Sequence, residues 1–117
     1  MISSFSFSDN TVGYILSGEV NQKTIDRMIK QIEDKWERFD QINLYLEDDN
    51  VEEFTLGAIV KEFQFKLSNA EKFEKIALVT NRKWIKACSA LKNMLVSAEM
   101  RAFDTENRLE ALSWVGY

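Results

Sequence analysis

Large apolar residues recur along the chain with two different spacings, which predict strands and helices in alternation. Five short runs are rich in strand-forming residues: 2–8, 11–18, 41–48, 75–80 and 99–103. The polar pair Asp9-Asn10 separates the first two runs, which are therefore predicted to form a β-hairpin. The run 75–80 is almost wholly apolar, as is typical of a central strand covered on both faces.

The helical spacing appears after each of the later runs. Asn21 is a predicted N-cap, and the residues after it place six apolar side chains on one helical face: Ile25, Met28, Ile29, Ile32, Trp36 and Phe39. Two more helices are predicted over 55–67 and 82–95. A last helix is predicted to begin at Asp104 or Thr105 and to contain Leu109, Leu112 and Val115.

The resulting order, ββαβαβαβα, predicts an α/β fold. Strands that alternate with helices form right-handed crossovers and a mostly parallel sheet. We expect a mixed sheet of about five strands, with the first strand antiparallel, flanked by about four helices. The length of 117 residues fits one domain, over 1–117.

Composition narrows the class of protein. The net charge is −4 and no run of Lys or Arg occurs, which argues against nucleic-acid binding. No apolar stretch approaches the 18 or so residues of a membrane span, and the first ten residues lack the features of a secretion signal. The single cysteine, Cys88, fits a reducing compartment. We therefore expect a cytoplasmic protein.

The residue types that are missing exclude most familiar catalytic systems. The absence of histidine removes Ser-His-Asp and Cys-His nucleophiles and all His-ligated metal sites. The four glycines form no phosphate-binding loop. No pair of carboxylates can be placed together from the sequence alone. We therefore expect no enzymatic activity, no cofactor and no bound metal.

An acidic segment stands between the third strand and the next helix, and it contains Glu47, Asp48, Asp49, Glu52 and Glu53. Carboxylates can hold Mg²⁺ or Ca²⁺, but this spacing does not match the calcium-binding EF-hand loop. Acidic residues before a helix are also favoured by the helix dipole. We predict a solvated loop that precedes the helix, and likewise a solvated cap at Arg82 and Lys83.

Two stretches carry a resemblance to a known family: "TLGAIVKEFQFKLSNAEKFEKIALVTNRKW" and "SAEMRAFDTENRLEALSW". The chain resembles the SpoIIAA-like family, part of the group of STAS and Sec14-like domains. The most specific parts are the FEKIALVTNRKW junction and the AEMRAF and ALSW segments near the end. The resemblance implies a small α/β domain with a central sheet of about five strands.

The resemblance also implies two kinds of function. Family members are regarded as possible carriers of apolar small molecules that associate with membranes, and the related anti-sigma-factor antagonists are phospho-regulated binding partners. Those antagonists carry a phosphorylated serine in the turn that corresponds to residues 52–57. Here Thr55 is the only hydroxyl in that turn and falls on a glycine position, so its simpler role is a helix N-cap. Phosphorylation of Thr55 is a hypothesis.

Aromatic and apolar residues of the two middle helices are the candidates for a binding site. Phe65 falls nearly opposite the predicted core face of its helix, where solvent is expected. A cleft between helices 55–67 and 82–95 would be lined by Leu56, Ile59, Phe63, Phe65, Trp84 and Met94. The alternative is that these side chains belong to the core.

The leading hypothesis is a non-enzymatic domain that binds an apolar, lipid-like molecule in this cleft and associates with a membrane surface. The alternative is a protein-interaction module, related to the anti-sigma-factor antagonists, that lacks the phosphorylatable serine. A homodimer is expected in either case, because a small domain can bury spare aromatic surface in this way.

Overall fold

The computed structural model describes the backbone of residues 2–51, 73–82 and 99–116, and the side chains of 9–50, 73–82 and 99–116. The elements within these ranges are β1 (Ile2–Ser8), β2 (Thr11–Gly18), α1 (Gln22–Trp36), β3 (Ile42–Val51), β4 (Phe73–Val79), β5 (Glu99–Phe103), the 3-10 turn η2 (Thr105–Asn107) and α4 (Arg108–Gly116). The helices predicted over 55–67 and 82–95 lie outside the described residues.

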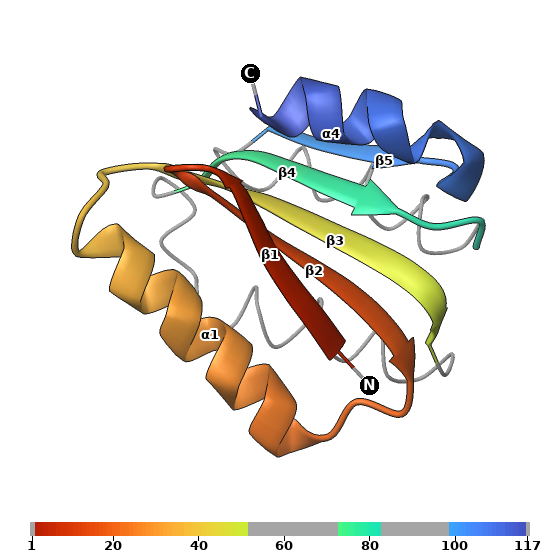
Figure 1. The fold of residues 1–117 in the computed structure, drawn as a ribbon, viewed down its shortest axis with the longest axis horizontal. Coiled ribbons are helices and arrows are strands. Elements are labelled where there is room, and N and C mark those ends of the chain that lie inside the picture. The colour runs from red at the N-terminus through yellow and green to blue at the C-terminus, as the bar shows by residue number, and fades with distance from the viewer. Residues whose placement is uncertain (1, 52–72, 83–98, 117) are drawn as a thin grey trace.

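The five strands form one sheet in the order β1-β2-β3-β4-β5 (Figure 1). β1 pairs with β2 in the antiparallel sense, as expected of the hairpin, and β2, β3, β4 and β5 are mutually parallel. The predicted α/β class and mostly parallel sheet are therefore confirmed. Among the described strands, the order in the sheet follows the order in the chain without a reversal, so these five strands form none of the switch points at which doubly wound sheets open a crevice.

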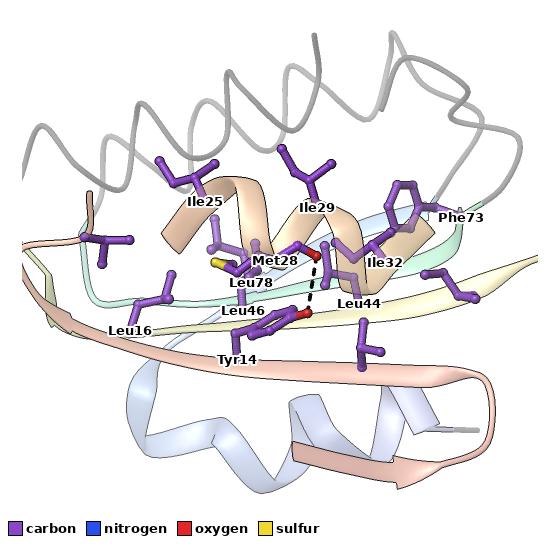
Figure 2. Packing of buried hydrophobic residues seen from close by; sticks show 13 residues of the cluster. Tyr14, Leu16, Ile25, Met28, Ile29, Ile32, Leu44, Leu46, Phe73 and Leu78 are labelled. Atoms are coloured by element: carbon purple, nitrogen blue, oxygen red, sulfur yellow. Dashed lines mark hydrogen bonds between the residues drawn. The ribbon is translucent and has the colours of Figure 1, made fainter. Parts of the chain in front are cut away.

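Helix α1 covers one face of the sheet. Asn21 caps it as predicted, because its side-chain oxygen accepts a hydrogen bond of 3.0 Å from the Thr24 amide. The predicted apolar face packs onto alternate residues of β2 and β3 (Figure 2). The fully or largely buried members of this cluster include Leu16, Ile25, Met28, Ile29, Ile32, Leu44 and Leu46.

The end of α1 is closed by partly buried aromatic residues. Trp36 and Phe39 pack against the α1 cluster, as expected, and the Trp36 ring meets Phe73 edge-on with centroids 5.0 Å apart. The helix itself ends at Trp36, so Phe39 lies in the connection to β3.

Helix α4 covers the opposite face of the sheet, over β3 and β4 (Figure 1). The buried cluster under it consists of Tyr45, Ala77, Val79, Phe103, Ala111 and Val115. Ala77 and Val79 face α4 while their neighbour Leu78 joins the α1 cluster, so β4 is covered on both faces as its apolar sequence predicts.

Two cations hold the indole of Trp114 at the end of α4. The Lys75 ammonium lies 5.6 Å from the ring centroid and donates a hydrogen bond of 3.1 Å to the Trp114 carbonyl. The Arg101 guanidinium lies 5.2 Å from the same ring. A cation that binds a carbonyl in the last turn also complements the negative end of the helix dipole.

The final helix differs from its prediction in two respects. Asp104 stands before the 3-10 turn, where its side chain makes no capping hydrogen bond, and the α-helix begins only at Arg108. Leu109 is 77% exposed, because Ala111 and Val115 define the buried side of α4 and Leu109 lies about 200° from Ala111 around the helix axis.

Tyr14 on β2 is a buried phenol beneath α1. Its hydroxyl donates a hydrogen bond of 2.8 Å to Gln31 Oε1 and lies 3.5 Å from the Met28 carbonyl (Figure 2). Burial raises the pKa of Tyr14 to about 12 from its ordinary value of 10.0. The folded state therefore keeps this phenol neutral at pH values where the unfolded chain has already lost the proton.

We expect stability to fall in alkaline solution. Because the folded pKa of Tyr14 is raised, its contribution is complete below about pH 10 and is lost as the pH rises towards 12. Tyr14→Phe is expected to cost about 1 kcal/mol near neutral pH, through the lost hydrogen bond, and to reduce the alkaline loss. Urea unfolding at about pH 8 and about pH 11 measures both effects. Equal alkaline losses in the two proteins would contradict the assignment.

Candidate functional site

The carboxyl ends of the four parallel strands meet at one edge of the sheet. β2 ends at Gly18, β3 at Val51, β4 at Val79 and β5 at Phe103. Figure 1 shows the ends of β2, β3 and β4 on the same side of the molecule. In α/β proteins this edge is where functional side chains usually gather, because successive strands present their following loops there. We refer to it as the carboxyl edge.

Three polar residues form a cluster on the α1 side of this edge. The Thr80 hydroxyl donates a hydrogen bond of 2.8 Å to Asp48 Oδ2, and Arg82 Nε lies 3.0 Å from the same oxygen. The Arg82 amide in turn donates to Thr80 Oγ1 over 3.1 Å. Asp48 and Thr80 are buried, whereas 25% of the Arg82 side chain is exposed.

A second cluster lies on the α4 side. The Tyr45 hydroxyl donates a hydrogen bond of 2.5 Å to Glu47 Oε1, and Arg108 Nη2, at the start of α4, lies 3.4 Å from Glu47 Oε2. Tyr45 and Glu47 are both buried. Burial is the main cause that raises the pKa of Tyr45, and the hydrogen bond to Glu47 and its negative charge raise it further.

The two clusters are joined through adjacent residues of β3. Successive strand residues point to opposite faces, so Glu47 and Asp48 enter different layers of the protein. The expectation that these two acids lie in a solvated loop is wrong. β3 remains paired with β2 as far as Val51 and with β4 as far as Glu47, which carries both carboxylates into the interior. The expected solvated cap at Arg82 is wrong for the same reason, since Arg82 is the partner of Asp48.

Beyond Asp48 the edge becomes exposed. Leu16 pairs with Asp48, but Gly18 pairs with Val51, so β3 has one more residue than β2 in this interval and forms a bulge. Asn50 lies in the bulge with φ 61°, in the left-handed region that asparagine tolerates better than most residues. Gly18 has φ 63°, where a substituted side chain would be strained even though space is available.

The loops that follow β4 and β5 are fixed to one another. The Thr80 amide donates a hydrogen bond of 2.9 Å to the Phe103 carbonyl, and the Thr105 amide donates one of 2.9 Å to Asn81 Oδ1. Together with the two buried clusters, these bonds hold the ends of β3, β4 and β5 and the start of α4 in one arrangement.

Exposed acidic residues surround these fixed groups. Glu19 follows β2, Asp49 lies in the bulge, and Glu106 lies in the 3-10 turn, and all three are exposed. We call these three residues the acidic rim. Within the described residues, no three acidic or cysteine side chains come together closely enough to hold a metal ion.

The site residues proposed from the sequence lie elsewhere in the chain. Thr55 and all six cleft candidates fall outside the described residues, namely Leu56, Ile59, Phe63, Phe65, Trp84 and Met94. Sequence reasoning did not anticipate the roles of Thr80 and Arg108. Their position in the chain could have indicated the contact of Thr80 with Asp48. Glu47-Asp48 and Thr80–Arg82 stand at the carboxyl ends of neighbouring parallel strands, where side chains from the two strands meet.

Comparisons with known proteins agree with the fold. A protein family described as SpoIIAA-like matches residues 11–116. The chain is similar to the crystal structure of an uncharacterised protein of the DUF3478 family from Shewanella loihica PV-4, which has a SpoIIAA-like fold. The TM-score is 0.67 at 15% sequence identity, over 98% of this chain and 92% of that one. A comparison with curated proteins finds no match.

Proposed function

The chain belongs to the SpoIIAA-like family, and we propose that it is a non-enzymatic interaction module that binds a protein partner at the carboxyl edge of its sheet. The observation that carries this proposal is the acidic rim, which stands on strand ends held by two ion pairs with buried carboxylates, Asp48–Arg82 and Glu47–Arg108. Among the described helices, none is long and apolar enough to cross a membrane.

The two ion pairs favour a binding role over a catalytic one. Each carboxylate already has a guanidinium and a hydroxyl within hydrogen-bonding reach, so its charge is committed to neighbours inside the protein. Ion pairs of this kind add little net stability compared with apolar packing. Here they connect the end of β3 with Arg82, which follows β4, and with Arg108 at the start of α4. A surface whose loops are already ordered loses less entropy on binding.

The charge of the rim indicates the chemistry of the partner. Glu19, Asp49 and Glu106 are exposed acids, and the two arginines of the carboxyl edge face buried carboxylates. The whole chain also carries a net charge of −4. A partner with a basic surface would be attracted to this edge, and complementary charge increases both the association rate and the specificity.

A carrier of an apolar, lipid-like molecule with membrane association is the second hypothesis. It rests on the cleft candidates of 55–67 and 82–95, which lie outside the described residues, so no contact described above supports it. The two functions differ in what accompanies the purified protein. A carrier retains an apolar compound, and an interaction module retains a protein.

Charge reversal on the rim tests the proposal. We expect Asp49→Lys to weaken capture of a basic partner at least about tenfold, because like charges then oppose each other across the contact. Glu33→Lys is the matched control, since Glu33 is an exposed acid towards the other end of α1, which runs back from the carboxyl edge. Affinity purification after cross-linking, followed by binding measurements with the captured partner, gives the comparison.

Two outcomes would contradict the interaction module. Equal capture by the Asp49→Lys and Glu33→Lys proteins would remove the rim as the contact surface. A stoichiometric apolar compound, released by organic solvent from natively purified protein and identified by mass spectrometry, would instead support the carrier.

A further inference from the structure

The two edge strands of the sheet differ in charge. β5 contains Glu99 and Arg101, which are both exposed, within its five residues. β1, at the other edge, is Ile-Ser-Ser-Phe-Ser-Phe-Ser and contains no charged residue and no proline. Edge strands usually carry charges or proline, which prevent pairing with another chain. Of the two edge strands in the described part of the chain, β5 has that protection and β1 does not.

The outer side of β1 remains available for pairing within the described part of the chain. β1 is the terminal strand of the sheet, and its only neighbour there is β2 (Figure 1). Its pairing with β2 is regular from Ile2 to Phe5, after which the register shifts before Ser8. A bulge of this kind disturbs an edge, so the segment Ile2–Phe5 is the part that can accept another strand.

We propose that Ile2–Phe5 is a self-association surface, on which β1 of a second copy of this chain pairs in the antiparallel sense. A two-fold axis perpendicular to the sheet places one residue of each strand opposite its own symmetry mate. In Ile2–Phe5 the central residues are Ser3 and Ser4. A charge at such a position would oppose an identical charge, and a small uncharged residue avoids that repulsion.

The same symmetry argument explains why the partner is a second copy rather than β5. Pairing of β1 with β5 of another molecule would be head-to-tail and would extend into an open filament unless it closed into a ring. The charges of Glu99 and Arg101 act against that arrangement. Pairing of β1 with itself joins two sheets of five strands and leaves both β5 edges outermost. This inference does not depend on the acidic rim, which lies at the strand ends.

We expect a dimer that dissociates on dilution, because a contact centred on one strand edge is small beside the roughly 1,200–2,000 Å² of stable interfaces. Sedimentation velocity over a wide range of protein concentration measures it. Ser3→Lys should weaken the dimer at least about tenfold, since the two lysines then lie opposite or close to one another. Ser3 is chosen because it is a central residue of Ile2–Phe5 and its register partner Ile15 is not fully buried.

Two controls separate this edge from other surfaces. Ser113→Lys introduces the same charge at an exposed position of α4 and should leave the dimer intact. Leu109→Lys tests the exposed leucine of α4, which is the competing apolar contact. Loss of the dimer in Leu109→Lys but not in Ser3→Lys would overturn the proposal, as would a wild-type protein that is monomeric at every concentration.

A charge-swap mixture distinguishes repulsion from misfolding. Ser3→Lys and Ser3→Glu should each be monomeric and folded, as judged by circular dichroism. An equimolar mixture of the two should then restore the dimer, because opposite charges face each other. A mixture that stays monomeric contradicts the assignment. If Ser3→Lys does not fold, hydrogen exchange of the wild-type protein tests whether the β1 edge is the contact surface. Amides of Ile2–Phe5 should exchange more slowly at high concentration while those of β5 do not change, and the absence of this difference rejects the β1 edge.

Discussion

Asp48→Ala is expected to lower the free energy of unfolding by roughly 3 kcal/mol, near the lower end of the range for breaking a buried ion pair. The substitution leaves the Arg82 guanidinium without its carboxylate and the buried Thr80 hydroxyl without its acceptor. The value is placed at the lower end because a quarter of the Arg82 side chain (25%) already reaches solvent. Urea unfolding near neutral pH measures the change.

The next residue provides the control for this prediction. Asp49 has the same side chain on the same strand but is exposed in the bulge, so Asp49→Ala should change the free energy of unfolding by no more than about 0.5 kcal/mol. Similar losses for Asp48→Ala and Asp49→Ala would mean that Asp48 is not part of a buried pair. Asp48→Asn should retain part of the stability, because the amide oxygen can still accept the bond from Thr80.

Ile32→Ala is expected to lower the free energy of unfolding by about 2–5 kcal/mol. Ile32 is fully buried in the α1 cluster, where α1 meets the sheet. Removing its outer carbons loses apolar burial and leaves a cavity that the surrounding side chains fill only in part. Thermal and urea unfolding both report the loss.

A substitution on the outer face of α1 separates packing from helix propensity. Lys30 is exposed two residues before Ile32, and Lys30→Ala replaces it with the best helix former without creating a cavity. We expect Lys30→Ala to change stability by less than about 0.5 kcal/mol. If Ile32→Ala were equally mild, the contact between α1 and the sheet could not be the main source of stability.

The arrangement of the sheet was accessible from the sequence because it depends on local patterns. The hairpin follows from two strand-like runs around Asp9-Asn10, and α1 follows from Asn21 and a single apolar face. Each later strand follows a segment of helical period, which favours parallel neighbours. The start of α4 was less predictable, because a 3-10 turn precedes the helix and no side-chain cap at Asp104 marks its beginning.

The buried clusters of the carboxyl edge could not be predicted from local patterns. Charged residues are depleted in strands, so the acids from Glu47 onwards indicated that the strand run 41–48 passes into a solvated loop. What makes their burial possible lies far away in the chain, since Thr80 is 32 residues from Asp48 and Arg108 belongs to the last helix. Without these partners Glu47 and Asp48 would have to remain in water.

The strand order also has a consequence for how the protein folds. Because every strand pairs with the next one along the chain, the sheet can be assembled in the direction of synthesis, beginning with the β1–β2 hairpin. The hairpin closes over two residues and forms within about 1–10 μs, whereas each parallel strand is added only after a much longer connection, of 19 or more residues, has closed. The hairpin therefore gives the later strands an ordered β2 edge on which to align.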